Sequence, residues 1–118
     1  MYNKRSIGAR FEQIADKYLT EQGYVILDHN FQCRTGEIDI IAKESGYLVF
    51  IEVKFRSSTV KGLPQEAIDM RKIIKISRTA LYYMLKKHIS DDTPCRFDVV
   101  HILDKDISII KNAFEAIL

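Results

Sequence analysis

The chain has 118 residues, of which 47% are hydrophobic and 29% are charged, and its formal net charge is +2. This length predicts one domain, over residues 1–118, with a core of its own. No stretch approaches the roughly 20 apolar residues that cross a membrane, and the N-terminus does not resemble a secretory signal, so we expect a cytoplasmic protein without a membrane partner. Cys33 and Cys95 form no C-x-x-C motif, and we expect free thiols rather than a disulfide.

Hydrophobic periodicity and turn residues predict two helices and five strands. Ser6 is suited to cap the first helix, Gly23 to end it, and Pro64 to begin the second helix. Three strands with short connections precede the second helix and indicate an antiparallel meander. The expected elements, in chain order, are a helix over 6–22, strands over 24–31, 37–42 and 47–54, a helix over 64–88, and strands over 97–103 and 107–110. This order predicts an α/β fold, with one mixed sheet flanked by helices.

Positive charge is concentrated between Lys54 and Lys87, where nine basic residues accompany two acidic ones. Such an excess favours a polyanionic partner, and a solvated helix face is the alternative explanation. On the second helix, Arg71, Lys75 and Arg78 are expected to share one face. The expected apolar stripe of the same helix consists of Met70, Ile73, Ile74, Leu81, Met84 and Leu85.

Four charged residues lie inside two segments that otherwise have the composition of buried strands: Glu37, Asp39, Glu52 and Lys54. Charge in such a strand is costly unless it is paired or bound to a metal ion. Because side chains alternate along a strand, Glu37 and Asp39 are expected on one face and Ile38 on the other. If the two strands pair, Asp39 and Glu52 converge at one end of the sheet with Lys54 beside them.

Two converging carboxylates offer oxygen ligands, which suit Mg²⁺ or Mn²⁺. An ion held there would polarise a phosphoryl oxygen and help to generate hydroxide from water, and Lys54 would orient that water or neutralise charge on the phosphate. The alternative is an ion pair at the end of the strands. The bare Glu-x-Lys tripeptide carries no weight, because roughly 0.65 copies are expected by chance. Its position at the end of an apolar strand, after an acid-x-acid pair, carries the argument.

The spacing of Asp39, twelve further residues and then Glu52-Val53-Lys54 resembles the core of the PD-(D/E)XK nucleases, which include restriction endonucleases and Holliday-junction resolvases. The chain is still more similar to the small YraN-like family of predicted bacterial endonucleases, over nearly its whole length. The residues that carry this resemblance are Gly8, Glu12, Ala15, Tyr18-Leu19, Gly23-Tyr24, Asn30, Gly36-Glu37-Ile38-Asp39, Phe50-Ile51-Glu52-Val53-Lys54, Arg56, Lys72, Arg96-Phe97-Asp98-Val99-Val100 and Asn112-Ala113-Phe114. The proline that gives the motif its name is absent, and Ile38 precedes Asp39.

The resemblance implies a restriction endonuclease-like αβββαβ core, with the site at one edge of the sheet. It implies that Asp39, Glu52 and the Val53 backbone carbonyl bind Mg²⁺ or Mn²⁺. It also implies that Lys54 positions or activates the attacking water, and that Glu12 adds an acidic group from the first helix. The remaining candidates are Arg56, Arg71, Lys72 and Lys75 for nucleic-acid phosphate, and Glu37 and Gln65 as supporting residues.

These residues predict a Mg²⁺-dependent nuclease that hydrolyses phosphodiester bonds in DNA. A chain this small has no spare domain for reading sequence, so we expect recognition of backbone and shape, in branched or single-stranded DNA. Resolvase-like relatives act as symmetric dimers, which makes a homodimer plausible. One alternative is a non-catalytic nucleic-acid-binding module that retains the fold. Another is a protein-interaction domain whose basic helix meets an acidic partner.

Other polar residues are expected to serve the structure. His29, His88 and His101 are scattered without zinc-ligand spacing, and we expect structural or surface roles for them. Asp98 lies within an apolar strand, and we expect it to pair with Arg96 or another neighbour.

Overall fold

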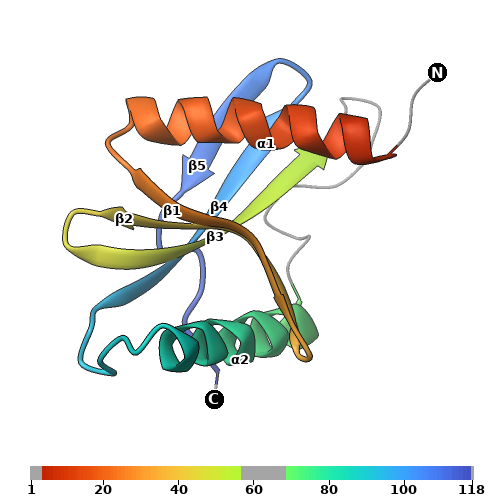
Figure 1. Cartoon of the computed structure of the whole chain (residues 1–118). Helices are drawn as coiled ribbons and strands as arrows, with labels where there is room; N and C mark the ends of the chain where they lie inside the picture. The colour runs from red at the N-terminus through yellow and green to blue at the C-terminus, as the bar shows by residue number, and fades with distance from the viewer. Residues whose placement is uncertain (1–3, 57–68, 118) are drawn as a thin grey trace.

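The computed structural model describes residues 4–56 and 69–117, with side chains from Arg10 onwards. Its elements are α1 (Lys4–Glu21), β1 (Val25–Cys33), β2 (Gly36–Glu44), β3 (Tyr47–Arg56), α2 (Met70–Lys86), β4 (Cys95–Leu103) and β5 (Asp106–Ile110). The strands form one five-stranded sheet in the order β1-β2-β3-β4-β5, with α1 and α2 on either side (Figure 1). The predicted α/β class, a mixed sheet flanked by helices, is therefore confirmed.

Strand directions follow from the connections between them. β1, β2 and β3 form the expected antiparallel meander, and β4 and β5 are also antiparallel. β3 and β4 are parallel, and α2 lies in the connection between them. A parallel pair needs such a crossover, because a short turn cannot return the chain to the same end of the sheet.

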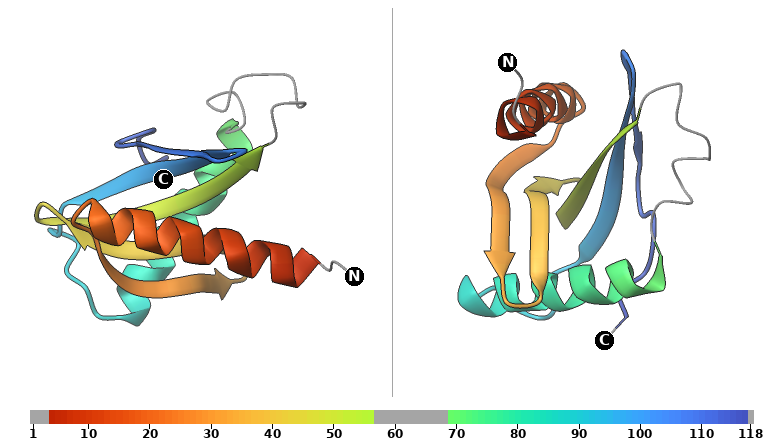
Figure 2. Two further views of the ribbon diagram at one scale, coloured as in Figure 1. Left: turned by 90° about the horizontal axis from the view of Figure 1, so that it is seen from above. Right: turned by 90° about the vertical axis from the view of Figure 1, so that its right-hand side faces the viewer.

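Each face of the sheet is covered by one helix (Figure 2, right). Val49 and Ile51 of β3 pack with Leu19 of α1 in one buried cluster. Leu48 and Phe50, which alternate with them along the strand, belong to the cluster that contains α2. The central strands therefore carry apolar residues on both faces, which explains why they read as continuous apolar runs in the sequence.

The second helix begins later than predicted. It starts at Met70, and Asp69 is its N-cap residue, with φ −98°, ψ 174° and a side chain that accepts a 2.9 Å hydrogen bond from the Lys72 amide. The predicted continuous helix from residue 64 is wrong, because Asp69 has extended backbone geometry. Pro64 itself lies outside the described residues.

The apolar stripe predicted for this helix is also wrong in part. Met70, Leu81 and Leu85 are 62%, 42% and 67% exposed. The buried face instead consists of Ile76, Ser77, Thr79, Ala80, Tyr83 and Met84. The hydroxyl groups of Ser77 and Thr79 donate to carbonyl groups one turn earlier in the helix, and this removes most of the cost of burying them.

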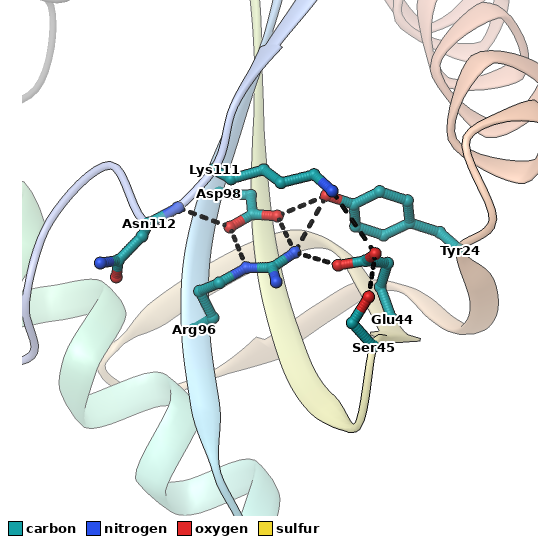
Figure 3. A network of polar contacts seen from close by, with 7 residues as sticks. All are labelled: Tyr24, Glu44, Ser45, Arg96, Asp98, Lys111 and Asn112. Carbon is teal, nitrogen blue, oxygen red and sulfur yellow. Dashed lines mark hydrogen bonds and ion pairs between the residues drawn. The ribbon is translucent and has the colours of Figure 1, made fainter.

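A buried network of polar groups joins β4 to the ends of other elements (Figure 3). Asp98 is 0% exposed, and the predicted pair with Arg96 is confirmed. Its four hydrogen bonds come from Tyr24 Oη at 2.6 Å, Arg96 Nε at 2.9 Å, Arg96 Nη2 at 2.8 Å and the Asn112 amide at 2.9 Å. Arg96 Nη2 also lies 2.8 Å from Glu44 Oε1. The charge of Asp98 is therefore fully compensated within the fold.

The predicted free thiols are confirmed at Cys33 and Cys95. In the part of the chain that the structure describes, neither helix is long and apolar enough to cross a membrane.

Candidate active site

The candidate site lies where β2 and β3 separate. Their pairing ends at Ile40 and Ile51, and β3 then continues beside β4 alone. The beginning of β2 turns away with β1 towards the middle of α2, where Gly36 lies near Thr79, so that β2 and β3 form a V (Figure 1). Asp39 and Glu52 are the next residues after the last paired positions. Both carboxylates therefore stand at the opening of this V.

Strand alternation is interrupted at this point. Ile38 packs in the same cluster as Ile41, on the α2 side of the sheet, although residues three apart in a regular strand face opposite ways. The regular alternation that we expected along this strand therefore does not hold from Ile38 to Ile41, because these two side chains share a face. The interruption lies opposite Asn30, whose φ of 49° is in the left-handed region that asparagine tolerates.

Beyond Ile51, β3 is no longer paired with β2, and the Asp39 carboxylate accepts a backbone hydrogen bond there in place of a strand partner. Its Oδ2 accepts a 2.8 Å hydrogen bond from the Val53 amide. Burial of the side chain, followed by repulsion from the Glu52 carboxylate, raises the pKa of Asp39 to about 7. The Val53 hydrogen bond and the Lys72 charge oppose this rise without cancelling it. Asp39 and Glu52 are thus close enough to repel each other.

Two lysines meet the Glu52 carboxylate. Lys72 Nζ lies 2.6 Å and Lys54 Nζ 3.6 Å from Glu52 Oε1, and the Glu52 side chain is 11% exposed. Burial lowers the pKa of Lys72, but its hydrogen bond to Glu52 helps to outweigh burial, and the net shift is upward. Burial, followed by the neighbouring Lys72 group, lowers the pKa of Lys54. The two lysines therefore differ in how firmly they hold their protons.

A cavity of about 430 Å³ opens beside this group. Glu37 and Glu52 line it from the sheet, and Arg71, Lys72 and Lys75 line it from the first two turns of α2. The cavity therefore combines acidic groups on the strands with basic groups on the helix.

A close contact fixes the beginning of β2 against α2. Gly36 has a φ of 146°, and a Cβ atom at this position would lie 3.4 Å from Thr79 Oγ1. The hydroxyl groups of Thr35 and Thr79 are hydrogen-bonded at 2.9 Å. Glycine tolerates this positive φ, and the turn that it allows places Glu37 at the same cavity as Lys75.

The structure brings Asp39, Glu52 and Lys54 together, but it does not add Glu12 to a metal-binding group. Within residues 4–56 and 69–117, no group of three or more His, Cys, Asp or Glu side chains is placed to hold a metal ion. Glu12 is half-buried on α1, and its role stays a prediction. Gln65 lies outside the described residues.

The donor set fits a hard divalent cation nevertheless. Asp39, Glu52 and the Val53 backbone carbonyl offer only oxygen atoms, and Mg²⁺ is commonly held by one or two carboxylates while it keeps several waters. Burial of Asp39, together with repulsion from the Glu52 carboxylate, raises the pKa of Asp39, and a bound cation would relieve both effects.

Sequence reasoning missed the contacts of two residues. Lys72 was predicted to contact phosphate, which stays a prediction, and its ion pair with Glu52 was not foreseen. The signal that could have found it is Asp69, since an aspartate N-cap puts Lys72 in the first helical turn. His101 was assigned no role in the site, although it pairs in register with Lys54 on the neighbouring strand.

Comparison with known proteins gives a family but no activity. A family model described as "Uncharacterised protein family UPF0102" matches residues 11–102. A UPF0102 protein of Lachnoclostridium phytofermentans is 54% identical over 114 residues, which cover 97% of each chain. A UPF0102 protein of Clostridium botulinum strain 657 is 45% identical over 120 aligned positions, covering 97% of this chain and 98% of its own.

Proposed function

This chain belongs to the uncharacterised protein family UPF0102, and we propose that it is a Mg²⁺- or Mn²⁺-dependent nuclease that hydrolyses phosphodiester bonds in DNA. The observation that carries the proposal is the convergence of Asp39 and Glu52 beside Lys54 and Lys72, where two strands separate. A protein that only binds DNA has no need of paired carboxylates, because they repel phosphate unless a cation is present. The resemblance to YraN-like predicted endonucleases supports the same assignment.

Asp39, Glu52 and the Val53 carbonyl would hold the metal ion. When bound, a divalent cation supplies positive charge that polarises a phosphoryl oxygen. The protein contributes the fixed geometry: the Val53 amide holds Asp39 in place, and the pairing of β3 with β4 holds Glu52. Both ligands thus come from strands rather than from loops.

The two lysines take different roles in the proposed reaction. Lys72 keeps its proton, and its side chain is 38% exposed beside the cavity, so it neutralises negative charge on the phosphate. Lys54 is only 20% exposed and lies beside the Glu52 carboxylate. Lys54 therefore positions the attacking water next to the proposed metal ligand.

The first two turns of α2 supply contacts to the DNA backbone. The cavity is lined by three positively charged residues, Arg71, Lys72 and Lys75. Arg56 is the last residue of β3 and lies on the same face of the strand as Lys54. Contacts of this kind read backbone and shape rather than base sequence. We therefore propose branched or single-stranded DNA as the preferred substrate.

The test is cleavage of labelled branched, duplex and single-stranded DNA by the purified protein in Mg²⁺ or Mn²⁺. Asp39→Asn and Glu52→Gln are each expected to reduce the rate by about 10³-fold, because each removes a charged ligand. Asp91→Asn, an exposed carboxylate between α2 and β4, is the matched control and keeps full activity. Absence of cleavage on all three substrates, or cleavage that survives both substitutions, would overturn the proposal.

One observation favours a non-catalytic nucleic-acid-binding module as a second candidate. Lys72 forms an ion pair with Glu52 at 2.6 Å, so this carboxylate has a cationic partner within the protein. This candidate predicts salt-dependent DNA binding that is insensitive to EDTA and to Lys54→Ala, with no cleavage under any condition. The cleavage assay, repeated as a binding assay in EDTA, separates the two.

A further inference from the structure

The second helix carries exposed positive charge along its whole length. Its sequence, from Met70 to Lys86, contains five basic residues and no acidic one. Lys72 pairs with Glu52. The other four are exposed and form no ion pair within residues 4–56 and 69–117: Arg71, Lys75, Arg78 and Lys86. Like charges at helical spacing repel one another and destabilise the helix, which indicates that they have a role outside it.

These side chains share one side of the helix with an exposed tyrosine. Arg71, Lys75 and Arg78 follow one another at intervals of four and three residues, and Tyr82 and Lys86 follow at further intervals of four. Residues at such intervals are neighbours on a helix surface. Tyr82 is itself 47% exposed. We call this set the α2 row, and it consists of Arg71, Lys75, Arg78, Tyr82 and Lys86.

The α2 row starts at the candidate active site. Arg71 and Lys75 line the cavity that Glu37 and Glu52 line from the sheet. Lys86 is 15 positions after Arg71, so the row is about 22 Å long at about 1.5 Å per residue. That length corresponds to about six nucleotides at about 3.4 Å each, the spacing of charges along one strand of B-DNA. The row therefore extends from the proposed cleavage site along the whole helix.

The α2 row follows the border between the helix and β1, the edge strand of the sheet. In its first half, a Cβ atom at Gly36 in the β1–β2 turn would lie 3.8 Å from Lys75 Cβ, and Figure 2 (right) shows this turn against α2. In its second half, the rings of Tyr82 and Phe31 have centroids 6.1 Å apart, and Lys86 Nζ lies 5.9 Å from the Phe31 centroid. Aromatic rings thus lie among the basic side chains of the second half.

The chemistry of the row suits single-stranded nucleic acid. Arginine and lysine side chains contact backbone phosphates without reading the sequence. An exposed tyrosine ring offers a surface on which an unpaired base stacks, whereas a base inside a duplex already stacks on its neighbours. An acidic protein segment would also match the charges of the row. The row begins beside a pair of carboxylates suited to a metal ion and a phosphodiester, and this favours nucleic acid.

We propose that the α2 row binds a single-stranded segment of the nucleic acid next to the candidate active site. The inference rests on the proposed nuclease function, since the bound segment belongs to the substrate. It assigns three further residues to substrate binding: Arg78 and Lys86 contact phosphates, and Tyr82 stacks on a base. It also narrows the substrate to DNA with an unpaired segment of about six nucleotides.

The first test measures how salt affects the binding of a fluorescein-labelled oligothymidylate roughly twice as long as the row. Fluorescence anisotropy follows binding, with Ca²⁺ in place of Mg²⁺ so that the strand is not cleaved. Arg78→Gln and Lys86→Gln should each lower the slope of log affinity against log salt by about 0.7, the value for one phosphate contact on a single strand. Lys17→Gln is the matched control, because Lys17 is exposed on α1, on the other face of the sheet, and it should leave the slope unchanged.

The second test separates stacking from charge at Tyr82. Tyr82→Leu removes the aromatic ring and should weaken binding by at least about fivefold, the lower limit for the stacking of one base. Its salt slope should equal that of the wild type, because no charge is removed. Tyr82→Phe keeps the ring and should bind as the wild type does. An equal loss of affinity in both variants would contradict stacking.

Wild-type affinity and slope in Arg78→Gln, Lys86→Gln and Tyr82→Leu would overturn the role of the α2 row and leave the nuclease proposal intact, because cleavage is measured separately. Duplex DNA that binds more tightly than the single strand would contradict the preference for unpaired bases. Poly-glutamate that binds as tightly as the oligonucleotide would assign the surface to an acidic protein partner and overturn the inference. Failure of the wild-type protein to bind any oligonucleotide would overturn both proposals.

Discussion

Two aspartates, Asp98 and Asp39, show that this fold treats buried negative charge in two ways. Asp98 is 0% exposed and accepts four hydrogen bonds, two of them from Arg96 (Figure 3). Asp39 accepts one hydrogen bond among the described residues, from Val53, and has the Glu52 carboxylate as a neighbour. The first charge is compensated within the protein, and the second is not. The Asp98 network therefore stabilises the fold, and the Asp39 group is suited to bind a cation.

The largest expected effect is on stability at Asp98. Asp98→Asn removes the charge but keeps the size of the side chain, and it leaves Arg96 buried with Glu44 as its remaining acidic partner. Breaking a buried ion pair in this way costs about 3–5 kcal/mol. The free energy of unfolding, measured by urea denaturation at pH 8, should fall by that amount. A loss below about 1 kcal/mol would contradict the assigned role.

Replacement of Asp39 by asparagine should change the free energy of unfolding in the opposite direction. The pKa of Asp39 is about 7 in the folded protein against an ordinary value of 3.8. The folded state therefore holds the proton more tightly than the unfolded state, and stability is lost as the pH rises from about 4 through 7. In EDTA at pH 8, Asp39→Asn should raise the free energy of unfolding by on the order of 2–4 kcal/mol.

This gain in the free energy of unfolding should disappear near pH 4, where the wild type and Asp39→Asn both carry an uncharged side chain at position 39. Urea denaturation across pH 4–8, on the wild type and Asp39→Asn in parallel, checks it. A variant that is less stable than the wild type at pH 8 would show that Asp39, like Asp98, serves the fold.

A substitution at Lys72 is expected to have a smaller effect, on the pKa of Asp39. The charge of Lys72 lowers the pKa of Asp39, so Lys72→Gln should shift the titration midpoint of Asp39 upward. Carbon-13 NMR of the Asp39 carboxyl group in EDTA measures that midpoint directly. Lys86→Gln, at the other end of α2, is the matched control and should leave it unchanged. A downward shift in Lys72→Gln would contradict the geometry described for Glu52 and Lys72.

Much of the fold was predictable because its signals are local. The order of elements and the meander follow from apolar strands separated by short polar turns. The start of α2 was not predicted, since Pro64 and Asp69 are both residue types that begin helices and the prediction took the earlier one. The buried face of α2 was partly missed because Ser77 and Thr79 bond to their own helix, which hydropathy alone does not register.

The centre of the candidate site was predictable for a different reason. Asp39 comes directly before an apolar run and Glu52 directly after one, and antiparallel pairing of the two strands brings them together. The residues that contact them could be identified only from the three-dimensional structure. Lys72 reaches Glu52 from a helix, and His101 meets Lys54 through the parallel register of β3 and β4, which no local pattern specifies.

The central claim is that the Asp39–Glu52 pair is a site for a divalent cation. The most direct test is the unfolding temperature at pH 8 with and without Mg²⁺, for the wild type and Asp39→Asn. At tenfold excess over its dissociation constant, Mg²⁺ should stabilise the wild type by about 1.4 kcal/mol, a rise of several degrees, and should leave Asp39→Asn unchanged. An unchanged wild type, or an equal rise in both proteins, would contradict the claim.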